Sequence, residues 1–508
     1  MLLISFSKLE IKPYLDGEKT LDECVEKLKM TTRRYAKRQL TWFRRNENIN
    51  WVYPDTCSQQ ELYDSVADKH VHLIVGGFPF IFVKKAQILS LNDGFLTIVL
   101  SWLLSFIFGM LPYVLWGGEF TLINAWFESV SGYTTTGSTI LSDVEALPKS
   151  LVFWRSSTHY IGGLGVVVFL LLVMPDASPY RLKLTNMELS SLSKEGYRYK
   201  SSKTIAVITK VYVILTVVFF LSLWAAGMTS FDALNHAFSL AATGGFSSRN
   251  LSIGHYGSDL INVLVIFFMA ISALHFGLIY AVFISRSLKP LNNTVVKYYF
   301  GSMLVMSVAI MLSLMSQGGY ESWGKAAMDS TFTVVSYMTT TGFAICDNSI
   351  WPWLAGMVLI FASFQCGCSG STTGGLKVDR ILISFKALSN EVHRRLHPTA
   401  VSQVRLSGHY LPDSAVHSVM LYIVVYFIVI FLSIIGVLLC GSEIPEAVSG
   451  VIASVGSVGP GLSGVGAMDN YSLQPAMAKF IYTVDMFLGR VEIFPVLVVL
   501  SLMFKRNR

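Results

Sequence analysis

A series of long apolar segments, beginning near residue 90, constrains this chain most strongly. An α-helix needs about 20 apolar residues to cross a bilayer core of about 30 Å. Charged residues form 14% of the 508-residue chain, well below the roughly 25% of soluble domains, which excludes an ordinary soluble enzyme. Helices pair their own backbone polar groups inside a bilayer, so we predict an all-α polytopic membrane protein. The predicted spans are 93–116, 150–174, 204–227, 258–284, 296–316, 352–368 with a continuation to 389, 416–440 and 474–503.

The placement of Lys and Arg predicts the orientation of these spans. The net charge is +7, and one set of loops holds most of the cations while the opposite loops are mainly acidic. Cytoplasmic loops are enriched in Lys and Arg, which predicts a cytoplasmic C-terminus. Whether the basic surface also docks a partner stays open. The basic set comprises Arg181, Lys183, Lys194, Arg198, Lys200, Lys203, Arg286, Lys289, Arg380, Lys386, Arg394, Arg395, Lys505, Arg506 and Arg508.

Four polar, glycine-containing segments recur between pairs of predicted spans. Each has an apolar stretch too short to cross a bilayer, followed by a turn rich in Gly, Thr and Ser. Aligning their glycines matches Gly137, Gly245, Gly342 and Gly459. Internal repetition of this kind predicts four units, each made of a helix, a half-helix, a glycine loop and a helix. Four such units around a central axis would form a cation pore. The segments are 125–141, 233–250, 329–348 and 446–466.

The composition of these turns suits a weakly hydrated monovalent cation. Irregular backbone at membrane depth is tolerated where it is buried in protein or lines a watery cavity. Carbonyl oxygens can replace a cation's water shell, and glycine permits backbone conformations that a Cβ disfavours. Packing glycines would be the better explanation of one such turn by itself, but four at matching positions favour a pore. The candidate filter residues are Thr135, Thr136, Gly137, Thr243, Gly244, Gly245, Thr340, Thr341, Gly342, Val458 and Gly459.

A second glycine-rich run, residues 366–377, interrupts the predicted span that begins at residue 352. Closely spaced glycines do not form a stable helix, and flexible backbone beside a cavity is suited to a gate. A phosphate-binding loop is excluded, because Leu376 stands where that motif requires lysine. The candidate gate residues are Gly367, Gly370, Ser371, Thr372, Thr373, Gly374, Gly375 and Lys377.

Arg490 is a charge inside an apolar segment, FLGRVEIF. A charge within a span is costly and marks a candidate functional site. Two interpretations stay open and can coexist: Arg490 sets the electrostatic potential of the pore, or it forms a structural ion pair with Glu492 or another carboxylate. For Arg155 and Asp485 we predict structural pairing instead.

With these motifs assembled, residues 88–508 resemble the TrkH branch of the Trk/Ktr/HKT superfamily of potassium transporters. The carrying motifs are SGYTTTGST, AATGGFSS, TTTGFA, SVGPGL, CGCSGSTTGGLKVDRI and FLGRVEIF. The resemblance implies a transporter rather than an enzyme, with K⁺ as the transported ion and no covalent or nucleotide cofactor on this chain. It also implies a homodimer in the bacterial inner membrane, surrounded by lipid, with a cytoplasmic ring of nucleotide-binding RCK-type subunits.

The same resemblance assigns roles to several residues. Glycine at the leading filter position accompanies K⁺ selectivity and serine marks sodium-preferring relatives, so Gly137 favours K⁺ and leaves the sodium-preferring relative as the alternative. In the family the 366–377 region is an intramembrane loop that obstructs the pore, and the arginine matching Arg490 lies near the pore.

The N-terminal region has a different character. Residues 9–53 resemble the C-terminal end of bacterial tRNA dimethylallyltransferase, carried by KPYLDGEKTLDECVEKLKMTTRRYAKRQLTWFRRNENINW. That enzyme's nucleotide-binding loop has no counterpart here, so we predict a remnant or a wrongly chosen start, with no transferase activity and no nucleic-acid partner. The predicted divisions are 1–70 (remnant), 71–92 (short apolar segment and linker), 93–175, 204–285, 296–390 and 415–508 (four pore repeats).

Overall fold

A computed structural model of the chain describes residues 91–173, 201–397, 403–406 and 409–505. The chain divides into two compact units, Met1–Ile88 and Leu89–Arg508, and the described residues belong to the second. The predictions for residues 1–70, for the apolar segment at 71–88 and for the basic loop at 181–200 lie outside the described residues.

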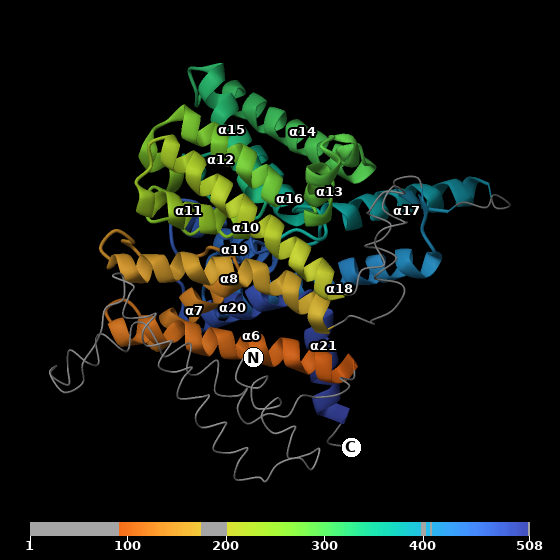
Figure 1. Cartoon of the computed structure of the whole chain (residues 1–508), viewed down its shortest axis with the longest axis horizontal. Coiled ribbons are helices and arrows are strands. Elements are labelled where there is room, and N and C mark those ends of the chain that lie inside the picture. Colours follow the sequence, from red (N-terminus) through yellow and green to blue (C-terminus); the bar gives the residue numbers. More distant parts are fainter. Residues whose placement is uncertain (1–90, 174–200, 398–402, 407–408, 506–508) are drawn as a thin grey trace, which may run out of the picture. The chain divides into compact units, whose positions relative to one another are not determined.

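The first half of the described chain forms two helical units (Figure 1). In each, a long helix is followed by a short helix, a glycine turn and a second helix. The first unit comprises α6, α7 and α8, and the second comprises α10 to α13. Their bounds are α6 Leu91–Trp116, α7 Leu122–Tyr133, α8 Lys149–Val173, α10 Ser201–Ala225, α11 Ser230–Ala242, η2 Ser252–Tyr256, α12 Asp259–Ser272, α13 Phe276–Ser285 and η3 Lys289–Leu291.

The second half repeats this order twice more. The third unit comprises α14 to α17, and the fourth comprises α18 to α21; a two-stranded antiparallel ribbon, β1 and β2, precedes α18. Their bounds are α14 Thr294–Ser316, α15 Trp323–Met338, α16 Trp353–Gln365, α17 Val378–Leu396, β1 Arg405–Leu406, β2 His409–Tyr410, α18 Asp413–Leu439, α19 Ile444–Gly456, η4 Ser463–Val465, α20 Ala476–Arg490 and α21 Phe494–Lys505.

Local sequence signals start the short helices. Thr121 caps α7 by accepting a hydrogen bond from the backbone N–H of Asn124, and Thr229 caps α11 in the same way through Asp232. Helix α19 instead has a proline in its first turn, where the missing N–H costs no helical hydrogen bond. These signals fix where three of the four short helices begin and therefore where their other ends meet the glycine turns.

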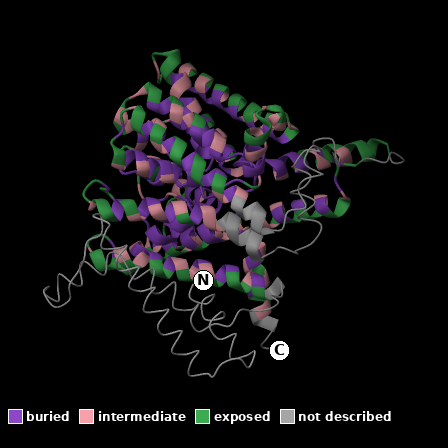
Figure 2. Cartoon of the chain, in the orientation of Figure 1, coloured by how far each residue is buried: buried purple, intermediate pink, exposed green. Residues whose placement is uncertain are grey.

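Each short helix also contacts the second helix of a neighbouring unit. Helix α11 packs on α8, α15 on α12, α19 on α16, and α7 on α20. Because the last of these contacts joins the fourth unit to the first, the set of contacts closes on itself. The buried residues follow the inner faces of the bundle, whereas the outer faces of the long helices are largely exposed (Figure 2).

The apolar outer surface belongs to helices long enough to cross a bilayer. Among the described residues, α6, α10, α14 and α18 meet that length and composition, and α12 with α13 forms a fifth, bent pair. Leu104, Val217, Val305 and Phe431 are among the large apolar side chains that these helices expose. Exposed apolar side chains in such numbers are expected of a lipid-facing surface.

Besides the span that begins at 352, whose interruption was predicted, two of the eight predicted spans are not continuous helices. The span at 258–284 is bent by 102° between α12 and α13, and the span at 474–503 is broken between α20 and α21. At the first break, the carbonyl of Ala273 accepts from Cys368 N–H at 2.9 Å, so a distant segment takes the place of a helical partner. At the second, Glu492 and Ile493 have positive φ, which ends α20.

Candidate functional site

The four glycine turns have the same backbone conformation. Thr135, Thr243, Thr340 and Ser457 adopt φ values of 53°, 54°, 54° and 53°, in the left-handed region that non-glycine residues rarely occupy. Two residues later in each turn comes one of the aligned glycines, also with positive φ. In each turn the backbone N–H that precedes the glycine donates to a carbonyl five residues back, at 2.8–2.9 Å.

The structure brings the four turns together in a closed order. A Cβ atom on any of the four aligned glycines would overlap a carbonyl oxygen of the next turn. That carbonyl belongs to the residue that precedes the aligned glycine of the next turn. The overlaps are Gly137 with Gly244, Gly245 with Thr341, Gly342 with Val458, and Gly459 with Thr136.

This arrangement, which we call the glycine ring, gathers all eleven candidate filter residues at one place. Carbonyl oxygens of Thr136, Gly244, Thr341 and Val458 each lie beside the glycine of an adjacent turn. Because each glycine combines a positive φ with no room for a Cβ, any larger residue would displace a carbonyl of the ring. The short helices end at the ring, so the negative ends of their dipoles point toward it.

Serine side chains hold three of the four turns from behind. Each lies six residues before the aligned glycine and donates to the carbonyl of the residue after it. Sequence reasoning missed these serines, although their shared spacing was visible in the aligned segments. In the fourth turn, Ala453 replaces the serine, and Pro460 is the residue after the aligned glycine. The bonds are Ser131 to Ser138 at 2.6 Å, Ser239 to Phe246 at 2.7 Å and Ser336 to Phe343 at 2.6 Å.

The loop at 366–377, which we call the inner loop, lies directly against the ring. Thr243 Oγ1 donates to Thr372 Oγ1 at 3.1 Å, and Gly374 N–H donates to Thr340 Oγ1 at 3.2 Å. A Cβ on Gly374 would overlap the Gly456 carbonyl beside Ser457. The inner loop therefore contacts the left-handed residues of three turns.

Neighbouring helices fix the two limbs of the inner loop. Phe276 N–H donates to the Gly370 carbonyl at 3.2 Å, and Val378 N–H donates to the Gly367 carbonyl at 3.0 Å. The Lys377 ammonium bends back onto the carbonyl and hydroxyl of Thr373. The remaining candidate gate residues lie in the same loop: Ser371 bonds the Thr373 hydroxyl at 2.8 Å, and Gly375 is packed against Cys366.

Arg490, the last residue of α20, contacts the inner loop. Its guanidinium donates to the Thr372 carbonyl and, at 3.4 Å, to the Gly162 carbonyl of α8. Glu492, which follows the break after α20, pairs with Arg380 of α17 at 2.9 Å. The printed contacts of the Arg490 guanidinium are thus with backbone carbonyls, and the choice between its two interpretations stays a prediction.

The other charged residues in spans differ in their partners. Arg155 pairs with the Glu128 carboxylate at 2.7 Å, which confirms structural pairing for Arg155. Asp485 accepts a hydrogen bond from Ser433 at 2.6 Å rather than pairing with a cation in the described contacts. Within the described ranges, no group of three or more His, Cys, Asp or Glu is arranged to hold a metal. The glycine ring, with its backbone oxygens, is thus the candidate ion site.

Apolar helices surrounding a ring of backbone carbonyls define a membrane transport protein. Residues 69–507 match the TrkH family, described as a cation transport protein. The match covers most of the sequence, and the chain belongs to this family. The resemblance of residues 88–508 to the TrkH branch is confirmed.

Individual relatives agree with this placement. The chain is 34% identical over 427 residues to the Trk system potassium uptake protein TrkH of Salmonella typhimurium, covering 84% of this chain and 88% of the relative. It is 31% identical over 446 residues to TrkG of Escherichia coli, covering 86% and 90%. The crystal structure of the potassium transporter TrkH from Vibrio parahaemolyticus superposes with a TM-score of 0.76 at 31% identity, covering 86% and 90% of the two chains.

A short second match concerns the N-terminal segment. Residues 7–46 match the IPP transferase family, in line with the resemblance seen at 9–53. The segment lies outside the described residues, and its interpretation as a remnant stays a prediction. The homologues of the rest of the chain are transporters.

Proposed function

We propose that this protein takes up potassium across the bacterial inner membrane, through a pore whose selectivity filter is the glycine ring. The closed order of Gly137, Gly245, Gly342 and Gly459 is the observation that carries the proposal. Four quasi-equivalent turns of one chain would surround K⁺ and exchange its water shell for carbonyl oxygens. Four short-helix C-termini add negative potential at the same place.

Hydroxyl groups would form a further layer of oxygens below the carbonyls. Thr135 and Ser457 bury hydroxyls that have no hydrogen-bond partner among the described residues. Thr243 and Thr340, at the matching positions, direct their hydroxyls to the inner loop. A buried hydroxyl without a partner is costly, and a bound cation would satisfy it.

The inner loop would act as the gate. It contacts three turns of the ring and carries the positive side chain of Lys377, with the Arg490 guanidinium bonded to Thr372. Two positive charges beside the path of a cation oppose its passage. Conduction therefore requires the inner loop to move away from the ring.

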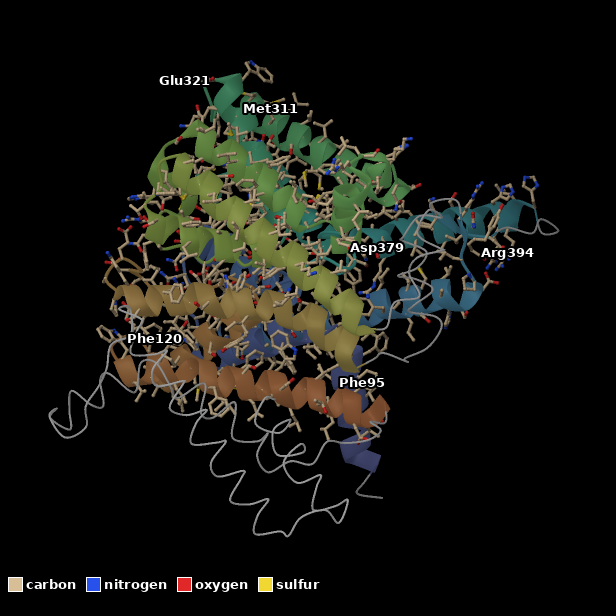
Figure 3. The ribbon with its side chains drawn as sticks, in the orientation of Figure 1. Phe95, Phe120, Met311, Glu321, Asp379 and Arg394 are labelled. Carbon is tan, nitrogen blue, oxygen red and sulfur yellow. The ribbon has the colours of Figure 1, made fainter. Side chains whose placement is uncertain are left out.

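Topology and partners follow the same proposal. Helix α17 and the C-terminal end of α21 lie toward the same side in Figure 1, with α17 extending outward from Asp379 to Arg394 in Figure 3. Basic residues of α17, including Arg394 and Arg395, support placing that side in the cytoplasm. There we place the C-terminus and the docking of an RCK-type ring onto a homodimer.

Flux through purified protein in liposomes tests the proposal. Liposomes containing the full-length chain should take up K⁺ in preference to Na⁺, and expression should restore growth of K⁺-uptake-deficient bacteria at low K⁺. Measuring flux with and without a pH gradient separates passive from proton-coupled transport. A Na⁺ flux larger than the K⁺ flux would favour the sodium-preferring alternative, and no flux of either ion by monodisperse protein would refute the pore.

A further inference from the structure

Behind the first two turns lies a fully buried ion pair. The Glu128 and Arg155 side chains are 0% and 2% exposed, and Arg155 Nε lies 2.7 Å from Glu128 Oε1. Glu128 belongs to α7, the short helix of the first unit, and Arg155 belongs to α8. Two charges removed from water at this depth need several further hydrogen bonds to be tolerated.

Those further bonds all go to the two glycine turns. Glu128 accepts from the Thr139 hydroxyl and from Ile140 N–H at 3.1 Å, two and three residues after Gly137. Arg155 donates to the Thr139 hydroxyl at 3.2 Å and to the Ser247 carbonyl at 3.3 Å, two residues after Gly245.

An aromatic contact strengthens the second of these links. The Arg155 guanidinium carbon lies 4.0 Å from the centre of the Phe246 ring, a favourable cation–π distance. Phe246 directly follows Gly245, and its carbonyl is already held by Ser239 at 2.7 Å. One side chain thereby fixes the outer limb of the second turn by a hydrogen bond and a ring contact.

The other two turns are linked by neutral groups. Tyr337 of the third unit donates its hydroxyl to the Gly461 carbonyl, two residues after Gly459, at 2.9 Å. Asn348 in turn donates to that tyrosine oxygen at 2.9 Å. Gly450 occupies the position that matches Glu128 in the fourth unit. The ring is therefore held by an ion pair on one side and by a tyrosine on the other.

We propose that Glu128 and Arg155 are a positioning pair that sets the geometry of the first two filter turns and so determines how strongly K⁺ is preferred to Na⁺. The proposal rests on the function proposed above. Arginine suits this role because its rigid fork bonds a carboxylate, a hydroxyl and a carbonyl at once, which a lysine cannot do. The pair does not touch the ion; it restrains the backbone whose carbonyls would.

The test is the K⁺/Na⁺ flux ratio of purified variants in liposomes. The double variant Glu128→Gln with Arg155→Met leaves no unpaired buried charge, and we expect it to conduct K⁺ with a ratio lowered about tenfold, the factor that corresponds to about 1.4 kcal/mol. Arg155→Lys should lower the ratio less. Arg249→Gln is the control, since Arg249 also joins the first two units through Glu145 and Asp232 but bonds none of the turn residues named above.

Two results would overturn the pair's role. One is a double variant that is monodisperse and keeps a ratio within about twofold of the wild-type protein. The other, decisive if the double variant does not fold, is an Arg155→Lys protein whose ratio equals that of Arg249→Gln. In both results the wild-type protein still prefers K⁺. If the proposed function were wrong, the wild-type protein itself would show no K⁺ preference, so the two failures can be told apart.

Discussion

The glycine ring and the inner ends of the second helices differ in symmetry. In the ring, four turns share φ values within one degree at the left-handed residue. Below it, the four second helices take different courses: α8 runs without a break, α12 and α13 meet at 102°, α16 ends at the inner loop, and α20 ends at Arg490.

If the proposed function holds, this contrast separates two requirements of a gated pore. Dehydrating an ion requires matching oxygens on all sides, and equivalence of the turns provides them. Blocking and releasing the ion requires a single element that can occupy two positions. Four equivalent units would hinder such a movement of one element. We propose that the inner loop is this element.

The largest effect should come from adding one Cβ to the ring. Gly245→Ala would combine positive φ with overlap on the Thr341 carbonyl, and we expect K⁺ uptake to fall about 100-fold, as about 3 kcal/mol of overpacking would give. Gly342→Ala should behave alike if the turns are equivalent. Gly257→Ala is the control, because Gly257 has positive φ but open space around it. Normal uptake by either ring variant would break the comparison.

Altering the inner loop should have the next largest effect, with the opposite sign. Deleting Gly370–Gly374 removes the segment that contacts Thr340 and Gly456, so K⁺ flux in liposomes should rise about tenfold, within the usual range of conformational coupling. Arg490→Gln should raise flux less, because it removes the bond to the Thr372 carbonyl. Arg395→Gln, on the exposed end of α17, serves as control. Unchanged or lower flux through folded protein would contradict a gate.

A serine at one ring position tests equivalence through ion selectivity rather than through the rate of uptake. Gly137→Ser places a side chain against the Gly244 carbonyl, which should turn one oxygen away from the ion and leave the other three. We expect the K⁺/Na⁺ flux ratio to fall about fivefold, the factor given by about 1 kcal/mol. The matching Ser138→Ala variant, which loses the bond from its hydroxyl to the Gly459 carbonyl, should change the ratio less. An unchanged ratio in Gly137→Ser would refute the role given to Gly137.

The sequence predicted the symmetric region better than the asymmetric one. The turns could be located because their glycines recur at matching places, and the inner loop because its glycines cannot form a helix. The bend at Ala273 was not predicted, since its cause is a bond from Cys368, 95 residues away. The pairing of Glu492 with Arg380 was missed for the same reason. Breaks made by tertiary hydrogen bonds leave no local composition signal.

The ion pair behind the turns marks a further limit of sequence reasoning. Arg155 could be singled out from the sequence because it is a charge inside an apolar span. Its partner Glu128 lies in a short helix, where an acidic residue gives no such signal. Their contact depends on α7 packing against α8, which periodicity alone does not specify.

The smallest effect should come from Asp232, in the first turn of α11, which pairs with Arg249 beyond the ring. Burial tends to raise the pKa of Asp232, but hydrogen bonds from Ser248 and Arg249 outweigh it and hold that pKa below its usual value. A lowered pKa means that the ionised carboxylate stabilises the fold above about pH 4, and that this stabilisation is lost as pH falls through the lowered value.

Asp232→Asn should therefore lower the free energy of unfolding by about 1 kcal/mol at pH 7, a value kept small because Arg249 is partly exposed to solvent. The difference from wild type should shrink as the pH falls below about 4. Thermal unfolding of the detergent-solubilised protein at both pH values measures this, with Glu321→Gln on an exposed loop (Figure 3) as control. Because Asp232 lies outside the glycine ring, the K⁺/Na⁺ flux ratio should not change. A changed ratio would mean that residues outside the ring also determine selectivity.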